Sequence, residues 1–356
     1  MPKVLHVLNE IRASGLERML ECSANQWRES DYDLTILGMG KSHPFALNLV
    51  NVGYSVNTIP NIKSLNGISQ YIKFLRNNNF DIIHIHTESM HGFLSLITKS
   101  LLPKTPIFRT IHNCFSAKGT KKFIRKIQNF LQNRLCSEVI SVSVDVEQNE
   151  KVQWGNQTSI IENWIDIEKI LSKTLKFGSM QNQFPVVAFL GNCSSVKDHE
   201  YALSVILDYQ DIRVIHMGYP HASTNDEIMI LKKLEDQGRL IWNSPTEQVI
   251  KNLLSADIHI LSSRNEGMSL ALMESIGVGM QSWVRECDGT RWAKNIESVK
   301  YFNSKSELAY LLEELIMEKK LHPDKYIFKP NSKLLERFNP ERGVREYVSL
   351  YQSFEN

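Results

Sequence analysis

Two glutamates, Glu266 and Glu274, lie with seven residues between them in the segment SSRNEGMSLALMESIGVG at positions 262–279. Ser269 is a suitable N-cap for a helix that the following apolar residues predict, ending at Gly277 or Gly279. A helix N-terminus presents unpaired N–H groups and the positive end of the helix dipole, so it binds anions such as phosphate. Carboxylates on both sides of an anion site suit a ligand with hydroxyl groups at each end and phosphate between them, such as a nucleoside diphosphate sugar.

This segment supplies most of the donor-binding residues that we predict. Glu274 would accept hydrogen bonds from ribose hydroxyls and Glu266 from the sugar, while the backbone amides of residues 268–271 would face the diphosphate. The alternative is that Glu266 is a solvated loop residue and that Glu274 lies on the exposed face of an amphipathic helix. The predicted residues are Glu266, Gly267, Met268, Ser269, Leu270, Ala271 and Glu274.

Short apolar runs that alternate with helical stretches are expected to position this segment. At 356 residues the chain exceeds the size of most single hydrophobic cores, so we expect two domains. The alternation predicts parallel α/β sheets of the Rossmann type, with a buried strand at 258–261 directly before the segment. The other predicted strands lie at residues 4–8, 34–37, 55–59, 81–85, 106–111, 138–142, 185–190, 213–217 and 240–242.

Composition excludes some classes of partner and location. The formal net charge of +2 argues against a dedicated nucleic-acid-binding protein. The 5 cysteines are scattered without paired spacing, which is typical of reduced thiols. The chain also lacks an apolar run long enough to span a bilayer. We therefore expect a cytoplasmic protein with no nucleic-acid partner.

Three histidines, His84, His86 and His112, stand at or near the carboxyl ends of predicted strands. Ligands of open α/β sheets bind at such ends, so these side chains are candidates for a site. The alternative is that each imidazole only forms a hydrogen bond with a neighbouring loop. The His-x-His pair could hold a metal, but no third ligand follows at a suitable spacing, so we expect no metal.

The Glu-x7-Glu pattern, with Gly267 after the first glutamate and Gly-Val-Gly after the second, resembles the signature of the retaining glycosyltransferases of family 4. The resemblance extends over nearly the whole chain. Residues 81–86 (DIIHIH) resemble the family's Asp-Val-Val-His-x-His, residues 110–113 (TIHN) its Thr-x-His-Asp, and residues 191–199 (GNCSSVKDH) its Gly-Arg-x4-Lys-Asp-His. Ser14-Gly15-Leu16-Glu17 resembles its Gly-Gly-Ala-Glu turn.

This resemblance implies the GT-B fold, in which two Rossmann-like doubly wound domains face a cleft. It implies transfer of a sugar from a nucleotide sugar, UDP-sugar first among them, with retention of configuration and without a metal or other cofactor. The acceptor would be a carbohydrate or a lipid-linked molecule, in glycan, cell-surface polysaccharide or glycoconjugate synthesis. Glu266, Lys197 and His112 would be the catalytic residues, and Gly15, Asn192 and Lys197 would join the donor-binding set.

Asn192 departs from the pattern, because the family usually has arginine there. Arginine offers a permanent positive charge to a leaving diphosphate, whereas asparagine offers only a neutral amide. Stabilisation of the leaving group would then depend on Lys197 and the helix dipole. The departure also supports an alternative, a non-catalytic GT-B protein that binds a sugar nucleotide or serves as a regulatory subunit.

The expected domain organisation follows from these matches. Residues 1–170 would form the acceptor domain and residues 171–184, which are polar and unpatterned, a linker. Residues 185–336 would form the nucleotide-sugar domain. The resemblance implies that a last helix within residues 337–356 crosses back to the first domain.

The segment 118–134 carries six basic residues and no acidic one. The apolar residues Phe123, Ile127, Phe130 and Leu131, with Leu135 directly after the segment, fall at helical spacing on the other side. The pattern is typical of a surface helix with a solvated basic face. It would also suit a site for an anionic acceptor, or a helix that holds the protein at the inner face of an anionic membrane through Lys118, Lys121, Lys122, Arg125 and Lys126.

Overall fold

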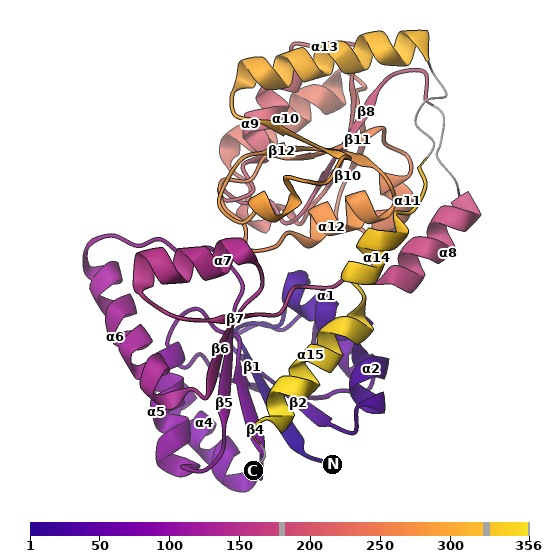
Figure 1. Cartoon of the computed structure of the whole chain (residues 1–356). Coiled ribbons are helices and arrows are strands. Elements are labelled where there is room, and N and C mark those ends of the chain that lie inside the picture. Colours follow the sequence, from indigo (N-terminus) through magenta and orange to yellow (C-terminus); the bar gives the residue numbers. More distant parts are fainter. Residues whose placement is uncertain (178–181, 323–327, 355–356) are drawn as a thin grey trace. The chain divides into compact units, whose positions relative to one another are not determined.

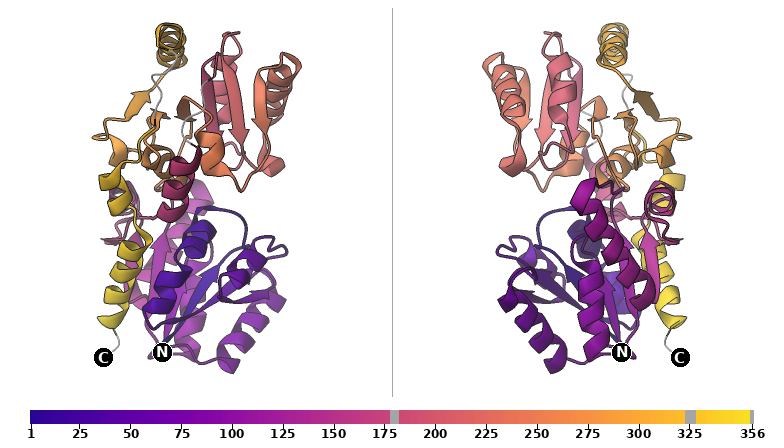
Figure 2. Two further views of the ribbon diagram at one scale, coloured as in Figure 1. Left: turned by 90° about the vertical axis from the view of Figure 1, so that its right-hand side faces the viewer. Right: turned by 90° about the vertical axis from the view of Figure 1, so that its left-hand side faces the viewer.

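Two parallel β-sheets organise the chain, one in each of two units (Figure 1). The computed structural model describes residues 1–177, 182–322 and 328–354. The first unit comprises Met1–Ile165 and Asn339–Asn356, and the second comprises Asp166–Phe338. Helices flank each sheet, as both views of Figure 2 show. The predicted α/β class with two Rossmann-like sheets is confirmed.

The first sheet has seven strands in the order β3-β2-β1-β4-β5-β6-β7. All of its strand pairs are parallel. Every residue of β4 and β5 is buried, as expected for strands that are covered on both faces. The strands are β1 (Lys3–Leu8), β2 (Asp33–Met39), β3 (Ser55–Ile59), β4 (Ile82–Ile85), β5 (Ile107–Ile111), β6 (Glu138–Ser141) and β7 (Ser159–Ile160).

The helices of the first unit include one from the far end of the sequence. In α15 (Pro340–Gln352), the buried Tyr351 packs on Phe108 of β5, with ring centroids 4.9 Å apart. The Asn339 side chain caps this helix by accepting a hydrogen bond from the backbone N–H of Glu341 (2.9 Å). The other helices are α1 (Gly15–Cys22), α2 (Ala24–Glu29), α3 (Ala46–Asn51), α4 (Leu65–Asn77), α5 (His91–Leu101), α6 (Gly119–Leu135), α7 (Val144–Asn149) and a π-helical turn (Glu150–Trp154).

The second sheet has six parallel strands in the order β10-β9-β8-β11-β12-β13. Its strands are β8 (Val186–Leu190), β9 (Arg213–Met217), β10 (Leu240–Asn243), β11 (Ile258–Leu261), β12 (Gln281–Arg285) and β13 (Val299–Phe302). Its helices are α8 (Ile167–Phe177), α9 (His199–Ile206), α10 (Asn225–Asp236), α11 (Val249–Leu253), α12 (Leu270–Gly277), α13 (Lys305–Leu321) and α14 (Ser332–Arg337). Two short 3-10 turns cover Pro220–Ala222 and Arg291–Ala293.

The predicted linker, residues 171–184, is not a continuous irregular segment. Helix α8 extends through Phe177 and therefore occupies its first part. Residues 178–181 of the predicted linker lie outside the described residues. Among the helices of the described ranges, none combines the length and the apolar character needed to cross a bilayer.

Candidate functional site

The Glu266–Glu274 segment forms the predicted strand, loop and helix. The loop begins directly after β11, and Ser269 caps α12 by accepting a hydrogen bond from the backbone N–H of Leu272 (3.5 Å). The N-cap prediction is therefore confirmed. Leu272, Met273 and Ile276 bury one side of α12 in the core, which fixes the helix against the sheet. Because α12 follows the carboxyl end of β11, its N-terminus lies at the edge where α/β sheets bind ligands.

Glu266 is held by three hydrogen bonds. Lys197 Nζ donates to its Oε1 atom (2.7 Å), and the hydroxyl of Ser263 donates to the same oxygen (2.6 Å). Its backbone N–H donates to the carbonyl of Asp288 (2.9 Å). Gly289 permits this approach, because a Cβ atom there would lie 2.0 Å from the Glu266 carbonyl oxygen. The Lys197–Glu266 ion pair is partly exposed, with 22% of the lysine side chain and 9% of the glutamate side chain accessible.

The loop that carries Lys197 is tied to the same segment by a second ion-pair group. Asp198, in the left-handed conformation (φ 50°), precedes α9, and its carboxylate accepts hydrogen bonds from Arg264 Nε and Arg285 Nη1 (both 2.7 Å). The Arg264 backbone N–H also donates to the carbonyl of Val196 (2.8 Å). Asp198, Arg264 and Arg285 were not among the predicted site residues. Asp198 lies in the motif beside Lys197, but the two arginines join it only through the fold.

The structure thus brings Lys197 and Glu266 into direct contact beside the start of α12. Of the other predicted donor-binding residues, Gly267, Met268, Ser269 and Ala271 are buried, whereas Asn192, Leu270 and Glu274 are half-buried. Glu274 is therefore not on a fully exposed helix face. Gly15 and His112 belong to the first unit. Gly15 is the first residue of α1, where the Ser14 hydroxyl donates to the carboxylate of Glu17.

His112, itself half-buried, is the end of a chain of imidazoles in the first unit whose other members are buried. His86 Nδ1 lies 3.0 Å from His112 Nε2, and His86 Nε2 lies 2.9 Å from His6 Nδ1. Burial lowers the pKa of His112 to about 4 and that of His6 to about 3, so both are neutral at pH 7. Burial also holds the pKa of His84 and of His86 well below the usual value.

Glu88 orders the backbone at His112. Its Oε1 atom accepts a hydrogen bond from the His112 backbone N–H (3.1 Å). Its Oε2 atom accepts from Arg109 Nη2 (2.9 Å) and from Arg125 Nη1 (3.2 Å). Arg125 also forms an ion pair with the buried Glu150 (3.3 Å). This network was not predictable from the sequence, since its members come from four separate segments.

Helix α6 contains the predicted basic segment, but its buried face differs from the predicted one. Arg125, Asn129 and Gln132 are buried, while the apolar side chains of Phe123, Ile124, Ile127 and Phe130 are 66%, 57%, 45% and 56% exposed. The prediction that Arg125 belongs to an accessible basic face is therefore wrong, because its guanidinium pairs with Glu88 and Glu150. The polar network beneath α6 determines which side of the helix faces inward.

Comparison with known proteins identifies the class. A family model described as "Glycosyltransferase Family 4" matches residues 13–169, and "Glycosyl transferases group 1" matches residues 173–282. The chain is 20% identical over 306 residues to N-acetyl-alpha-D-glucosaminyl L-malate synthase of Bacillus anthracis, covering 80% of this chain and 77% of that protein. An uncharacterized glycosyltransferase of Haemophilus influenzae is 21% identical over 287 residues, covering 77% of each chain.

Solved structures agree on the fold. HepE of Anabaena, crystallised with UDP-glucose, superimposes with a TM-score of 0.79 at 15% identity, covering 99% of both chains. A glycosyltransferase of Rickettsia africae superimposes with a TM-score of 0.76 at 14% identity, covering 99% of this chain and 98% of that one. Two Rossmann-like units of this kind form the GT-B fold. The chain belongs to glycosyltransferase family 4.

Proposed function

We propose that the chain transfers a sugar from a nucleotide sugar, with UDP-sugar as the first candidate, to a carbohydrate or lipid-linked acceptor with retention of configuration. The observation that carries the proposal is the partly exposed Lys197–Glu266 pair (2.7 Å) beside the N-terminus of α12. The UDP-glucose bound to the similarly folded HepE supports the choice of donor. Such a reaction would serve the synthesis of a glycan, a cell-surface polysaccharide or a glycoconjugate.

In this proposal Lys197 stabilises the charge that develops on the leaving diphosphate. A preorganised cation at the position of developing charge is among the largest contributions to catalysis. The N–H groups at the start of α12 would bind the diphosphate, and Glu274 would accept hydrogen bonds from the ribose. Lys197 and the helix dipole supply the positive charge, so we expect the transfer step to need no divalent cation.

Glu266 would orient the sugar rather than attack it. Lys197 and Ser263 both donate to its Oε1 atom, which fixes the carboxylate in place. Its other oxygen would accept from a sugar hydroxyl. The neutral imidazole of His112 would form a hydrogen bond with a hydroxyl of the transferred sugar, and the first unit would hold most of the acceptor.

A thermal-shift panel of nucleotides and nucleotide sugars tests the donor proposal. A ligand that binds only the native state at about 100 times its Kd stabilises the protein by about 2.7 kcal/mol. We expect UDP and at least one UDP-sugar to raise the Tm more than the matching ADP and GDP compounds. A panel in which no nucleotide changes the Tm would contradict donor binding.

Asn192 favours a second candidate function, in which the chain is a non-catalytic protein that binds the sugar nucleotide for regulation. Its neutral amide stands where the family's arginine would add a cation. The two candidates differ in UDP release, because only an enzyme liberates UDP from the donor, by transfer or by slow hydrolysis. If the thermal-shift ligand is never consumed over a long incubation with a range of acceptors, the regulatory role is favoured.

We also propose that α6 contacts an anionic bilayer peripherally. Its exposed apolar residues Phe123, Ile124, Ile127 and Phe130 are interspersed with exposed lysines. Apolar side chains enter the boundary between headgroups and acyl chains, and each nearby cation adds about 1 kcal/mol of attraction to anionic lipid. Charge complementarity therefore favours a membrane with anionic lipid as the partner of this face. The lysines concerned are Lys118, Lys121, Lys122 and Lys126.

A further inference from the structure

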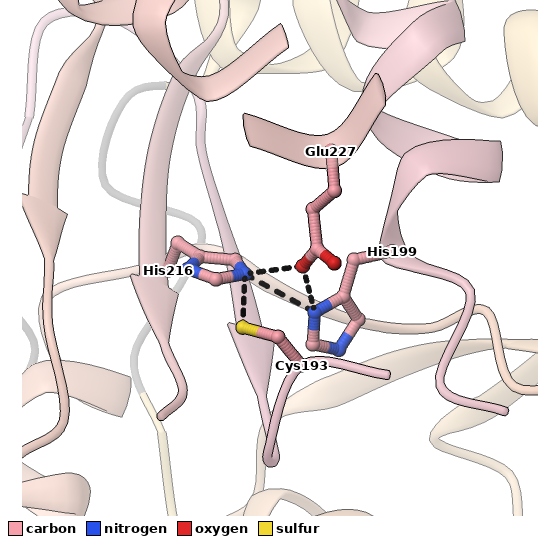
Figure 3. Close-up of side chains that lie close together, drawn as sticks. All are labelled: Cys193, His199, His216 and Glu227. Atoms are coloured by element: carbon pink, nitrogen blue, oxygen red, sulfur yellow. Dashed lines mark hydrogen bonds and ion pairs between the residues drawn. The ribbon is translucent and has the colours of Figure 1, made fainter. Parts of the chain in front are cut away.

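Four buried side chains of the second unit converge on one point (Figure 3). Cys193 follows β8, His199 begins α9, His216 lies on β9, and Glu227 lies in the first turn of α10. Each residue is no more than 3% exposed. One nitrogen, sulfur or carboxylate oxygen from each residue lies within 4.8 Å of the other three.

Four of the six separations between these atoms are close to the edges of a coordination tetrahedron. His199 Nδ1 lies 3.1 Å from His216 Nε2 and 3.1 Å from Glu227 Oε1, while His216 Nε2 lies 3.2 Å from Glu227 Oε1 and 3.8 Å from Cys193 Sγ. A zinc ion with ligands at about 2.0 to 2.3 Å requires ligand atoms roughly 3.3 to 3.8 Å apart. Only small movements would place all four atoms on such an ion.

A hydrogen bond outside the cluster orients His216 to bind a cation. Its Nδ1 atom lies 3.0 Å from Asn243 Oδ1, an acceptor, so the ring proton resides on Nδ1. Nε2 therefore directs a lone pair at the centre of the cluster, toward the Glu227 carboxylate (3.2 Å). Metal-binding histidines commonly donate their other ring N–H in this way.

We propose that Cys193, His199, His216 and Glu227 bind one zinc ion as a structural site. A set of one thiolate, two imidazoles and one carboxylate around a tetrahedral centre suits Zn²⁺ better than the oxygen-preferring Mg²⁺ or Ca²⁺. With all four ligands from the protein and all four buried, the site is of the closed, structural kind. A closed site is compatible with a transfer step that uses no divalent cation.

The site would position the loop that carries Lys197. Cys193 and His199 stand on either side of this lysine in the sequence, so one ion would fix both ends of the segment between them. Lys197 would then be held opposite Glu266, to which it donates at 2.7 Å. The three zinc ligands besides Cys193 come from the starts of α9 and α10 and from β9, which anchors the loop to the rigid part of the unit.

Metal analysis of the full-length protein tests the proposal without any activity assay. After growth with zinc and removal of loosely bound metal by brief dialysis against EDTA, we expect about one zinc per chain by plasma mass spectrometry. Cys193→Ser should retain much less zinc, and Cys22→Ser, which changes a cysteine of the first unit, should retain the wild-type amount. Zinc depletion with a stronger chelator should lower the Tm, and added ZnCl₂ should restore it.

Cobalt substitution examines the ligands directly. Apoprotein loaded with Co²⁺ should show the visible absorption of a tetrahedral site and a thiolate-to-cobalt charge-transfer band. The charge-transfer band should disappear in Cys193→Ser and persist in Cys22→Ser. If Cys193→Ser does not fold, the spectrum of the wild-type protein still decides. Wild-type protein with neither stoichiometric zinc nor a cobalt–thiolate band, and with a Tm indifferent to zinc, would overturn the proposal and leave a metal-free hydrogen-bond network.

Discussion

The carboxyl edges of the two sheets carry different kinds of ionisable groups. In the first unit these groups are imidazoles, half-buried at His112 and buried at the other three positions. Burial lowers the pKa of His6, His84, His86 and His112 far enough to keep them neutral. In the second unit a lysine and a glutamate form a partly exposed ion pair. The difference indicates that a charged ligand such as a diphosphate would find its counter-charge in the second unit, while the first offers neutral partners for hydroxyl groups.

The described residues contain two clusters of potential metal ligands, which differ in a similar way. His6, His84 and His86 also place ligand atoms close together. Their rings are stacked, however, with the His84 and His86 centroids 4.1 Å apart. Both His84 nitrogens are engaged by hydroxyls, Tyr351 at 2.5 Å and Thr110 at 2.8 Å. This cluster has no anionic member, so it is a hydrogen-bond chain, whereas the Cys193 cluster combines a thiol and a carboxylate with its imidazoles.

Removing the lysine at the second edge should have the largest effect. Lys197→Ala deletes the cation proposed to stabilise the leaving diphosphate, and losses of this type lower kcat by roughly 100- to 1,000-fold. Steady-state kinetics of UDP release would measure it. The matched control is Lys320→Ala, which removes an exposed surface ion pair with Asp211 and should stay within about twofold of wild type. If Lys197→Ala is as active as the wild-type protein, Lys197 does not stabilise the leaving diphosphate.

Reversing charges on α6 should have the next largest effect, on membrane binding. Lys121→Glu/Lys122→Glu/Lys126→Glu removes three cations, each worth about 1 kcal/mol near anionic lipid, so partitioning onto such vesicles should fall on the order of 100-fold or more. Co-sedimentation at low salt with phosphatidylserine-containing and with neutral vesicles would measure it. Arg125 is left unchanged because its charge is needed by the buried Glu150. Identical binding by wild type and variant would contradict membrane contact.

A smaller effect is expected from one imidazole of the first edge. The pKa of His6 is about 3 in the folded protein against 6.5 for the free side chain, so between these values mainly the unfolded chain takes up the proton. The contribution of His6 to the free energy of unfolding is therefore fully present above pH 6.5. It is lost on acidification by up to about 1.4 kcal/mol per pH unit. His6→Phe should remove the part that His6 contributes to the pH dependence of the free energy of unfolding. Urea unfolding from pH 7.5 to 4.5 measures it, and equal slopes would show that His6 is not buried and neutral.

Sequence patterns predicted the strands of both sheets well where the runs are apolar throughout, because strands covered on both faces need such runs. They missed β7, which has two residues, β12, whose end residues Gln281 and Arg285 are polar, and β13, whose residues Lys300 and Tyr301 are not buried. The N-cap at Ser269 was predictable because capping depends on neighbouring residues. Local patterns of this kind carry most of the fold.

Features that depend on distant contacts could not be predicted. Helical spacing shows that α6 has two faces, but only the fold reveals that Glu88 and Glu150 draw Arg125 inward. The Cys193, His199, His216 and Glu227 side chains come from separate elements without a recognised ligand spacing, so the cysteine pattern gave no sign of a cluster. Likewise, Lys197 and Glu266 could be chosen individually, but their contact required the structure.

The edge around Glu266 and Glu274 is proposed to bind the donor in one orientation. Isothermal titration calorimetry with UDP, which lacks the sugar, tests this orientation. We expect Glu274→Ala to weaken UDP binding by roughly tenfold, the value of one or two lost hydrogen bonds to ribose, and Glu266→Ala to leave the Kd for UDP within about threefold while lowering turnover. Equal losses of UDP affinity in the two variants, or no UDP binding by the wild-type protein, would contradict this orientation of the donor.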